Sequence, residues 1–113
     1  MRAIVPSLVL MSVAGAASAD GVDDFCGANG VPKPVCACAT ERLVPDIGQD
    51  DYALYHRVGG IAAELRGLDV DADAAWIAAL RKEAARSGAD PDYVRIRAEN
   101  VARAHRALIA LCE

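Results

Sequence analysis

The sequence predicts an all-α fold, a small four-helix bundle-like domain stapled by two disulfides. Apolar residues recur at spacings of three and four over most of the chain, and no stretch of strand length alternates apolar with polar residues. Four cysteines occur in a chain of 113 residues. In a domain of this size core burial and chain entropy nearly cancel, so we expect the cysteines to supply part of the stability.

The N-terminus has the pattern of a cleavable export signal. A positive charge at Arg2 precedes a short apolar run, and the small residues Ala17 and Ala19 occupy positions −3 and −1 of a cleavage site. We expect residues 1–19 to be a signal peptide cleaved after Ala19, and residues 20–113 to be a single helical domain. No later apolar stretch approaches about 20 residues, so we expect no transmembrane segment after signal removal. The predicted location is the periplasm or the cell exterior.

The first part of the predicted mature chain combines an irregular lead-in with a short helix. Residues 20–33 are predicted to be irregular, with a tight turn at Asn29 and Gly30 that returns the chain toward the first helix. That helix is predicted over residues 34–44, because proline suits the first helical position and Pro45 is expected to stop it.

The second helix is predicted to run from about Asp50 to Gly67. Acidic residues at its start complement the positive end of the helix dipole. Two adjacent glycines, Gly59 and Gly60, interrupt it and cost roughly 2 kcal/mol relative to alanine. They predict either a kink or another backbone packed very close. The buried stripe of this helix is expected to contain Leu54, Val58, Ile61 and Leu65.

The third helix is predicted to follow three alternating acidic residues, Asp69, Asp71 and Asp73, and to end at Gly88. Such a series also begins an EF-hand loop, but Ala74 stands where that loop needs glycine and no bidentate Glu follows at its last position. We therefore interpret these acids as helix caps. The apolar side of the helix is expected to contain Trp76, Ile77, Leu80 and Ala84.

The fourth helix has the clearest start in the chain, with Asp90 as N-cap and Pro91 at the first helical position. His105 lies on its apolar stripe, where a lone histidine is usually a packed residue with one hydrogen bond. The stripe consists of Val94, Ala98, Val101, His105, Leu108 and Cys112.

The four cysteines predict two disulfides. Cys36 and Cys38 are two positions apart on a helix, so their side chains point about 200° apart and do not bond to each other. The spacing favours Cys26 with Cys36 and Cys38 with Cys112. The exchanged arrangement, Cys26 with Cys38 and Cys36 with Cys112, is almost equally compatible with the sequence.

The charge distribution argues against nucleic acid and indicates a face for a protein partner. Removal of residues 1–19 leaves 11 of the 12 basic residues against all 16 acidic residues. Nucleic-acid binding requires clustered positive charge, so we expect no nucleic-acid partner. The last helix is the most basic part of the chain. Its outer face either pairs with the acidic half of the same domain or meets an acidic partner through Arg95, Arg103 and Arg106.

The sequence favours an exported, non-enzymatic protein that binds another protein, in a chaperone, inhibitor or immunity-like role. His56 has no nucleophile and orienting acid at a recognisable spacing, so we expect no catalytic residue. We also expect no cofactor and no metal. The alternative is a thiol-redox or metal-handling protein that uses Cys36 and Cys38 with Cu or Zn. The identity of the partner and the oligomeric state do not follow from the sequence.

Overall fold

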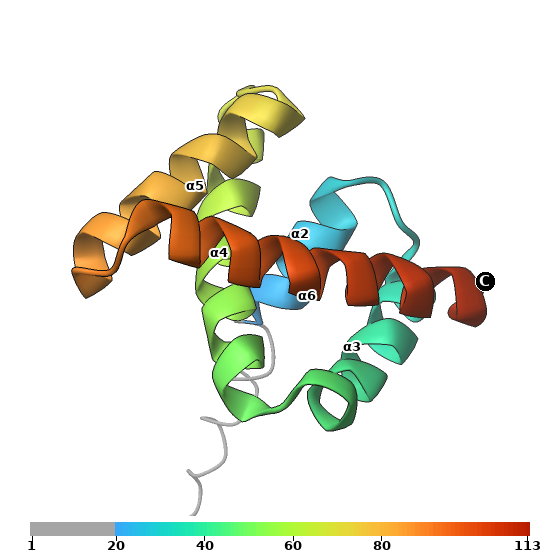
Figure 1. Ribbon diagram of the computed structural model, residues 1–113. Coiled ribbons are helices and arrows are strands. Elements are labelled where there is room, and N and C mark those ends of the chain that lie inside the picture. Colours follow the sequence, from blue (N-terminus) through green and yellow to red (C-terminus); the bar gives the residue numbers. More distant parts are fainter. Residues whose placement is uncertain (1–19) are drawn as a thin grey trace, which may run out of the picture.

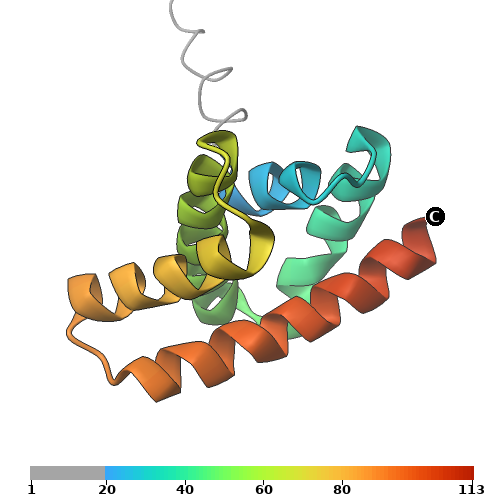
Figure 2. The same ribbon diagram turned by 90° about the horizontal axis from the view of Figure 1, so that it is seen from above.

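Five helices and no strand make up residues 20–113, the part of the chain that the computed structural model describes (Figure 1). The predicted signal segment lies outside the described residues. The central helix α4 contacts each of the other four; α6 crosses it in Figure 1 and runs past one end of it in the view of Figure 2. The predicted all-α class is confirmed. In chain order the helices are α2 (Gly21–Ala28), α3 (Lys33–Ile47), α4 (Gln49–Gly67), α5 (Ala72–Ser87) and α6 (Pro91–Cys112).

The core consists of two adjoining apolar clusters. Half-buried Phe25 and Trp76 pack against both clusters and join them. One cluster lies among α4, α5 and α6 and is rich in alanine, which lets these helices approach closely. It contains Leu54, Val58, Ala62, Ala75, Ala79, Leu80, Ala84, Val94 and Ala98. The other joins α2 and α3 to α4 and α6 and contains Val22, Leu43, Tyr55, Val101 and Ala102.

The prediction of an irregular lead-in is wrong, because residues 21–28 form helix α2. Asp20 caps this helix: its Oδ1 atom accepts hydrogen bonds from the backbone amides of Val22 at 2.8 Å and Asp23 at 3.3 Å. The predicted turn after it is confirmed, with Gly30 at φ +85°. The fold therefore has five helices in residues 20–113 where four were expected.

Close backbone packing explains the adjacent glycines of α4. A Cβ atom on Gly21 of α2 would lie 2.1 Å from the backbone oxygen of His56, and one on Gly59 would lie 2.9 Å from the backbone oxygen of Gly21. The Gly21 amide also donates a hydrogen bond to His56 Nδ1 at 2.9 Å. The sequence left open whether these glycines mark a kink or a closely packed backbone. The structure shows a closely packed backbone, and this contact anchors α2 on α4.

Helix α3 passes through Pro45, contrary to the prediction that it stops there. The helix continues to Ile47, and the Gly48 amide bonds to the Val44 carbonyl at 2.8 Å. Pro45 lies in the last turn, where the missing proline N–H removes one hydrogen bond near the end of the helix. Gly48, at φ +91°, then turns the chain into α4.

The predicted caps of the last two helices are confirmed at Asp71 and Asp90, whereas Asp69 lies in the turn before α5 at φ +67° and does not cap it. Asp71 Oδ1 accepts from the Ala74 amide at 3.1 Å, and Asp90 Oδ2 accepts from the Tyr93 amide at 3.1 Å. One predicted core residue of α5 is not in the core: Ile77 is 47% exposed. None of the helices within residues 20–113 is long and apolar enough to cross a membrane.

Two disulfides tie α3 to its neighbours and confirm the favoured pairing. Cys26 of α2 is bonded to Cys36, and Cys38 is bonded to Cys112 at the end of α6. The corresponding Cα–Cα distances are 5.8 and 6.1 Å. Because the side chains of Cys36 and Cys38 point in different directions, α3 is bonded both to α2 and to the end of α6.

Candidate functional site

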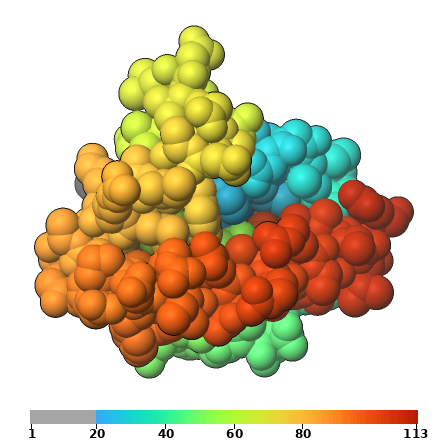
Figure 3. Space-filling view, turned by 45° about the horizontal axis from the view of Figure 1, so that its top comes forward, coloured from blue at the N-terminus to red at the C-terminus, as the bar shows by residue number. Residues whose placement is uncertain are grey.

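The candidate site is a groove of about 780 Å³ where α2, the start of α5 and the C-terminal half of α6 meet. Figure 3 shows the hollow between the blue, yellow and red parts of the surface. Its volume falls within the range typical of ligand-binding clefts. Sixteen residues line it: Phe25, Cys26, Asn29, Val31, Tyr55, Ala72, Asp73, Trp76, Glu99, Ala102, Arg103, His105, Arg106, Ile109, Ala110 and Glu113.

Aromatic rings from three helices gather at the groove. Phe25 and Trp76, the only phenylalanine and the only tryptophan of the chain, lie with ring centroids 5.3 Å apart and an interplanar angle of 25°. Tyr55 packs edge-on against both rings, with centroid distances of 5.9 and 6.3 Å. These contacts hold the rings in fixed orientations, which gives the groove a rigid apolar wall.

His105 is part of the groove lining and is only 2% exposed. Its Nδ1 atom lies 2.8 Å from the Tyr55 hydroxyl. The hydroxyl has no other hydrogen-bond partner within residues 20–113, so we assign it as the donor and Nδ1 as the acceptor. The ring proton is then on Nε2, which has no partner among the described residues. The expected single hydrogen bond is confirmed, and it leaves one buried donor unused.

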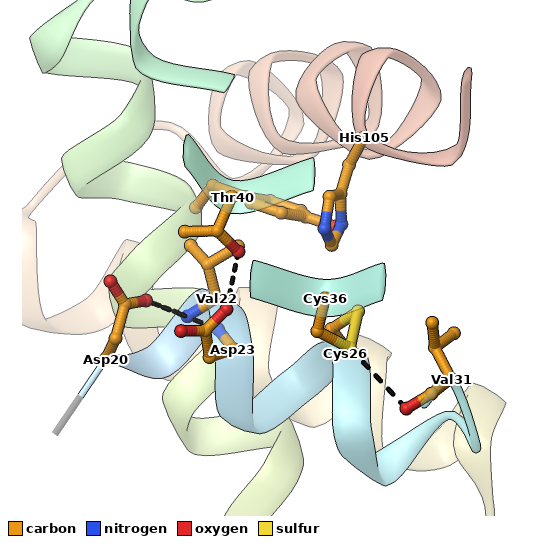
Figure 4. The surroundings of a disulfide bond; sticks show 9 residues. Asp20, Val22, Asp23, Cys26, Val31, Cys36, Thr40 and His105 are labelled. Carbon is orange, nitrogen blue, oxygen red and sulfur yellow. Dashed lines mark hydrogen bonds between the residues drawn. A yellow bond between two sulfur atoms is a disulfide. The ribbon is translucent and has the colours of Figure 1, made fainter. Parts of the chain in front are cut away.

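The surroundings of His105 favour its neutral form. Burial lowers its pKa below the usual 6.5, Asp23 partly opposes this effect, and the positive charge of Arg106 adds to it. Burial also raises the pKa of Tyr55, so the hydroxyl remains protonated and able to donate. Figure 4 shows the His105 ring pointing from α6 toward the disulfide between Cys26 and Cys36.

The three arginines of the predicted partner face have different surroundings, although all are exposed on α6. Arg103 and Arg106 line the groove. Arg103 donates to the Asn100 side chain, whereas Arg106 makes no ion pair or side-chain hydrogen bond within residues 20–113. Arg95 lies nearer the start of the helix, outside the groove lining.

Neighbouring carboxylates already compensate the charge of Arg95. Its guanidinium lies 3.6 Å from Asp92 and 3.4 Å from Glu99, both on the same helix. Each such exposed pair contributes only a few tenths of a kcal/mol up to about 1 kcal/mol. Arg103 and Arg106 are therefore the arginines of the predicted face whose charges no carboxylate pairs with within residues 20–113, and Arg106 also lacks a side-chain hydrogen bond there.

A second hollow, of about 620 Å³, lies between α2 and α3 and is lined by several acids. Asp20 caps α2 and accepts a hydrogen bond from the Tyr52 hydroxyl at 2.7 Å. Burial opposes ionisation of Asp20, but the bonds from Tyr52 and from the cap amides outweigh it and lower its pKa below 3.8. Asp23 accepts from the Thr40 hydroxyl at 2.6 Å, as drawn in Figure 4. Asp20 and Asp23 of this hollow therefore already have structural roles.

Glu83, a buried carboxylate, links α4 to α5. Its carboxylate is 1% exposed and accepts hydrogen bonds at 2.9 Å from both Arg57 and Arg86. Burial opposes its ionisation, but the two guanidinium groups outweigh this effect and lower its pKa. All its interactions are explained by helix packing, so we assign it a structural role.

The cysteines named in the alternative hypothesis are placed in different disulfides. Cys36 is buried with Cys26, which lines the groove, whereas Cys38 is bonded to Cys112 in the last turn of α6. Residues 20–113 contain no group of three or more histidine, cysteine or acidic side chains arranged to hold a metal ion.

The sequence alone did not indicate the groove. Phe25, Trp76 and His105 come from three helices and are far apart in the chain, so no local pattern connects them. The rarity of aromatic residues, which form 4% of the sequence, was the one available hint. The chain matches no family model, and no curated protein or solved structure is detectably similar to it. Its function must therefore be inferred from the groove and its residues.

Proposed function

We propose that this chain is an exported, non-enzymatic protein that binds another protein through the groove beside α6, in the periplasm or outside the cell. The observation that carries the proposal is the groove itself. It combines a fixed aromatic wall of Phe25 and Trp76 with the uncompensated charge of Arg106. Aromatic residues and arginine are the side chains most enriched where protein interfaces gain their binding energy.

The proposed export is supported by the start of the fold. Cleavage after Ala19 would make Asp20 the first residue of the mature protein. Asp20 caps α2 and bonds to Tyr52 of α4, so cleavage at this site retains every residue that the N-terminal helix needs. Two disulfides within 94 residues of mature chain also suit an oxidising compartment.

Site-specific photo-crosslinking tests the binding face. Ala110 and Ala107 are both exposed on the last two turns of α6, but only Ala110 lines the groove. A photo-reactive residue at Ala110 is expected to cross-link to one partner protein in cells of the native host, whereas the same residue at Ala107 is not. The Arg103→Glu/Arg106→Glu double variant should abolish the product, and the Arg81→Glu/Lys82→Glu double variant, with the same change of charge on exposed positions of α5, should retain it. Equal products from both positions, or none from either, would contradict the proposal.

A further inference from the structure

The groove has the length of an extended peptide. Along α6 its lining runs from Glu99 to Glu113, which corresponds to about 21 Å at a rise of 1.5 Å per residue. An extended chain covers the same distance with about six residues. The long shape fits a segment of a polypeptide better than a compact small molecule.

The chemistry along the groove specifies which segment fits. The rings of Phe25 and Trp76 offer an apolar wall to an inserted side chain. Arg106 offers a guanidinium with no ion-pair partner among residues 20–113, and it lines the same groove as the aromatic rings. A carboxylate is the side-chain group that a guanidinium binds most strongly, through two parallel hydrogen bonds.

His105 provides an independent observation in the same place. Its Nε2 atom is a buried donor whose hydrogen-bonding capacity is unused in residues 20–113, and the ring belongs to the groove lining. Leaving such a donor unpaired is costly, so a ligand that brings an acceptor oxygen to Nε2 from the groove gains additional stabilisation. Both the charge and the unused donor therefore favour an acidic group.

The acidic side chains of the lining restrict where this group can bind. Glu99 is paired with Arg95, Asp73 belongs to the first turn of α5, and Glu113 lies at the C-terminal end of the groove. A carboxylate is repelled at these places and attracted at Arg103 and Arg106, of which only Arg106 has no side-chain hydrogen bond within residues 20–113. The acidic group is thus directed to the part of the groove that these arginines line.

We propose that the groove binds an extended segment of the partner protein in which an acidic side chain directly adjoins an aromatic or large aliphatic one. The apolar side chain packs against Phe25 and Trp76, and the carboxylate binds Arg106 within reach of His105. This inference rests on the proposed function, because it names the part of the partner that the groove recognises.

Titration with a designed peptide tests the inference. The probe is the acetylated and amidated hexapeptide Ser-Gly-Phe-Glu-Gly-Ser, used with versions in which Gln replaces its acid or Ala replaces its aromatic residue. Binding is followed by NMR through the indole signal of Trp76, the only tryptophan, and the ring signals of His105. We expect saturable shifts at both residues and at least tenfold weaker binding of each altered peptide.

Variants of the protein complete the test. Arg106→Gln should weaken binding of the parent peptide at least tenfold, whereas Arg81→Gln, which removes the same charge from an exposed position of α5 outside the groove lining, should leave it unchanged. Equal binding of the acidic and amide peptides, an unaffected Arg106→Gln variant, or no shift at Trp76 would overturn the inference. If these results occur while the cross-link from Ala110 persists, the proposed function stands and only the recognised segment is wrong.

Discussion

His105 illustrates how one buried residue makes the fold sensitive to pH. Charged or titratable groups face it from three elements: Asp23 from α2, Tyr55 from α4 and Arg106 from its own helix. Burial and Arg106 lower the pKa of the folded-state ring below its usual 6.5, while the unfolded chain has the ordinary value. The unfolded state therefore binds a proton more readily, and acid favours unfolding.

We expect the free energy of unfolding to be constant above about pH 7 and to fall as the pH decreases from 6.5 toward 5. The pKa values of Asp20 and Glu83 are lowered from 3.8 and 4.5, so their contributions are lost only at still lower pH. Urea denaturation at a series of pH values measures the slope. His105→Leu should lack the slope between pH 6.5 and 5; a variant that retains it would exclude His105 as the cause.

Gly21 is a residue at which the addition of a single methyl group should strongly destabilise the fold. Its Cβ would lie 2.1 Å from the His56 oxygen and 2.9 Å from the Gly60 nitrogen, both backbone atoms that cannot rotate away. We expect Gly21→Ala to cost about 1 to 3 kcal/mol of stability, as overpacked cores do. Gly27→Ala in the same helix meets nothing within 4 Å and should be neutral or stabilising by up to about 1 kcal/mol. Similar unfolding midpoints for the two variants would contradict this account.

At the scale of elements, the sequence predicted the helices whose ends are set by local interactions. Asp71 and Asp90 cap their helices through amides three residues away, so a local pattern suffices to locate both starts. Helix α2 was missed because it is short and contains Gly21 and Gly27, and because its burial depends on contacts with α4. The groove was missed for a related reason, since residues of four helices form it.

The pairing of α4 with α5 depends on Glu83, which the sequence did not distinguish from surface acids. Replacement of both partners, Arg57→Gln and Arg86→Gln, leaves a buried carboxylate without a countercharge. We expect the double variant to lose about 3 to 5 kcal/mol of stability. The control, Arg81→Gln with Lys82→Gln, removes the same charge from exposed positions of α5 and should change stability by at most about 0.5 kcal/mol per site. If chemical denaturation showed the same loss of unfolding free energy for both double variants, the loss would be an effect of net charge and not of Glu83.

For the whole molecule, the sequence predicted that the cysteines form two disulfides and favoured the observed pairing. Local geometry alone indicates that Cys36 and Cys38 have different partners, because their side chains point in different directions from one helix. Choosing between their partners required knowing which side of α3 faces α2 and which faces the end of α6. That arrangement depends on the packing of all five helices, so the alternative pairing stayed open until the structure was known.

The two disulfides should contribute unequally to stability. In the chain-entropy model, the bond between Cys26 and Cys36, 10 residues apart, contributes about 2.8 kcal/mol, and the bond between Cys38 and Cys112, 74 residues apart, contributes about 4.5 kcal/mol. We therefore expect replacement of Cys38 and Cys112 by alanine to lower the unfolding free energy more than replacement of the other pair. Denaturation of both double variants measures the difference.

The oxidation state of the purified protein decides between a structural and a chemical role for these cysteines. If both bonds persist throughout its working cycle, the intact mass from an oxidising compartment is four hydrogens below that of the reduced chain, and thiol titration in denaturant finds no free thiol. Removal of metal with a chelator should then leave the thermal unfolding midpoint unchanged. Two reactive thiols, or one Cu or Zn ion per chain in native mass spectrometry, would instead favour thiol or metal handling by Cys36 and Cys38. Such a result would also require α3 to separate from α2 or α6, because each of these two cysteines is the link that holds α3 to one of those helices.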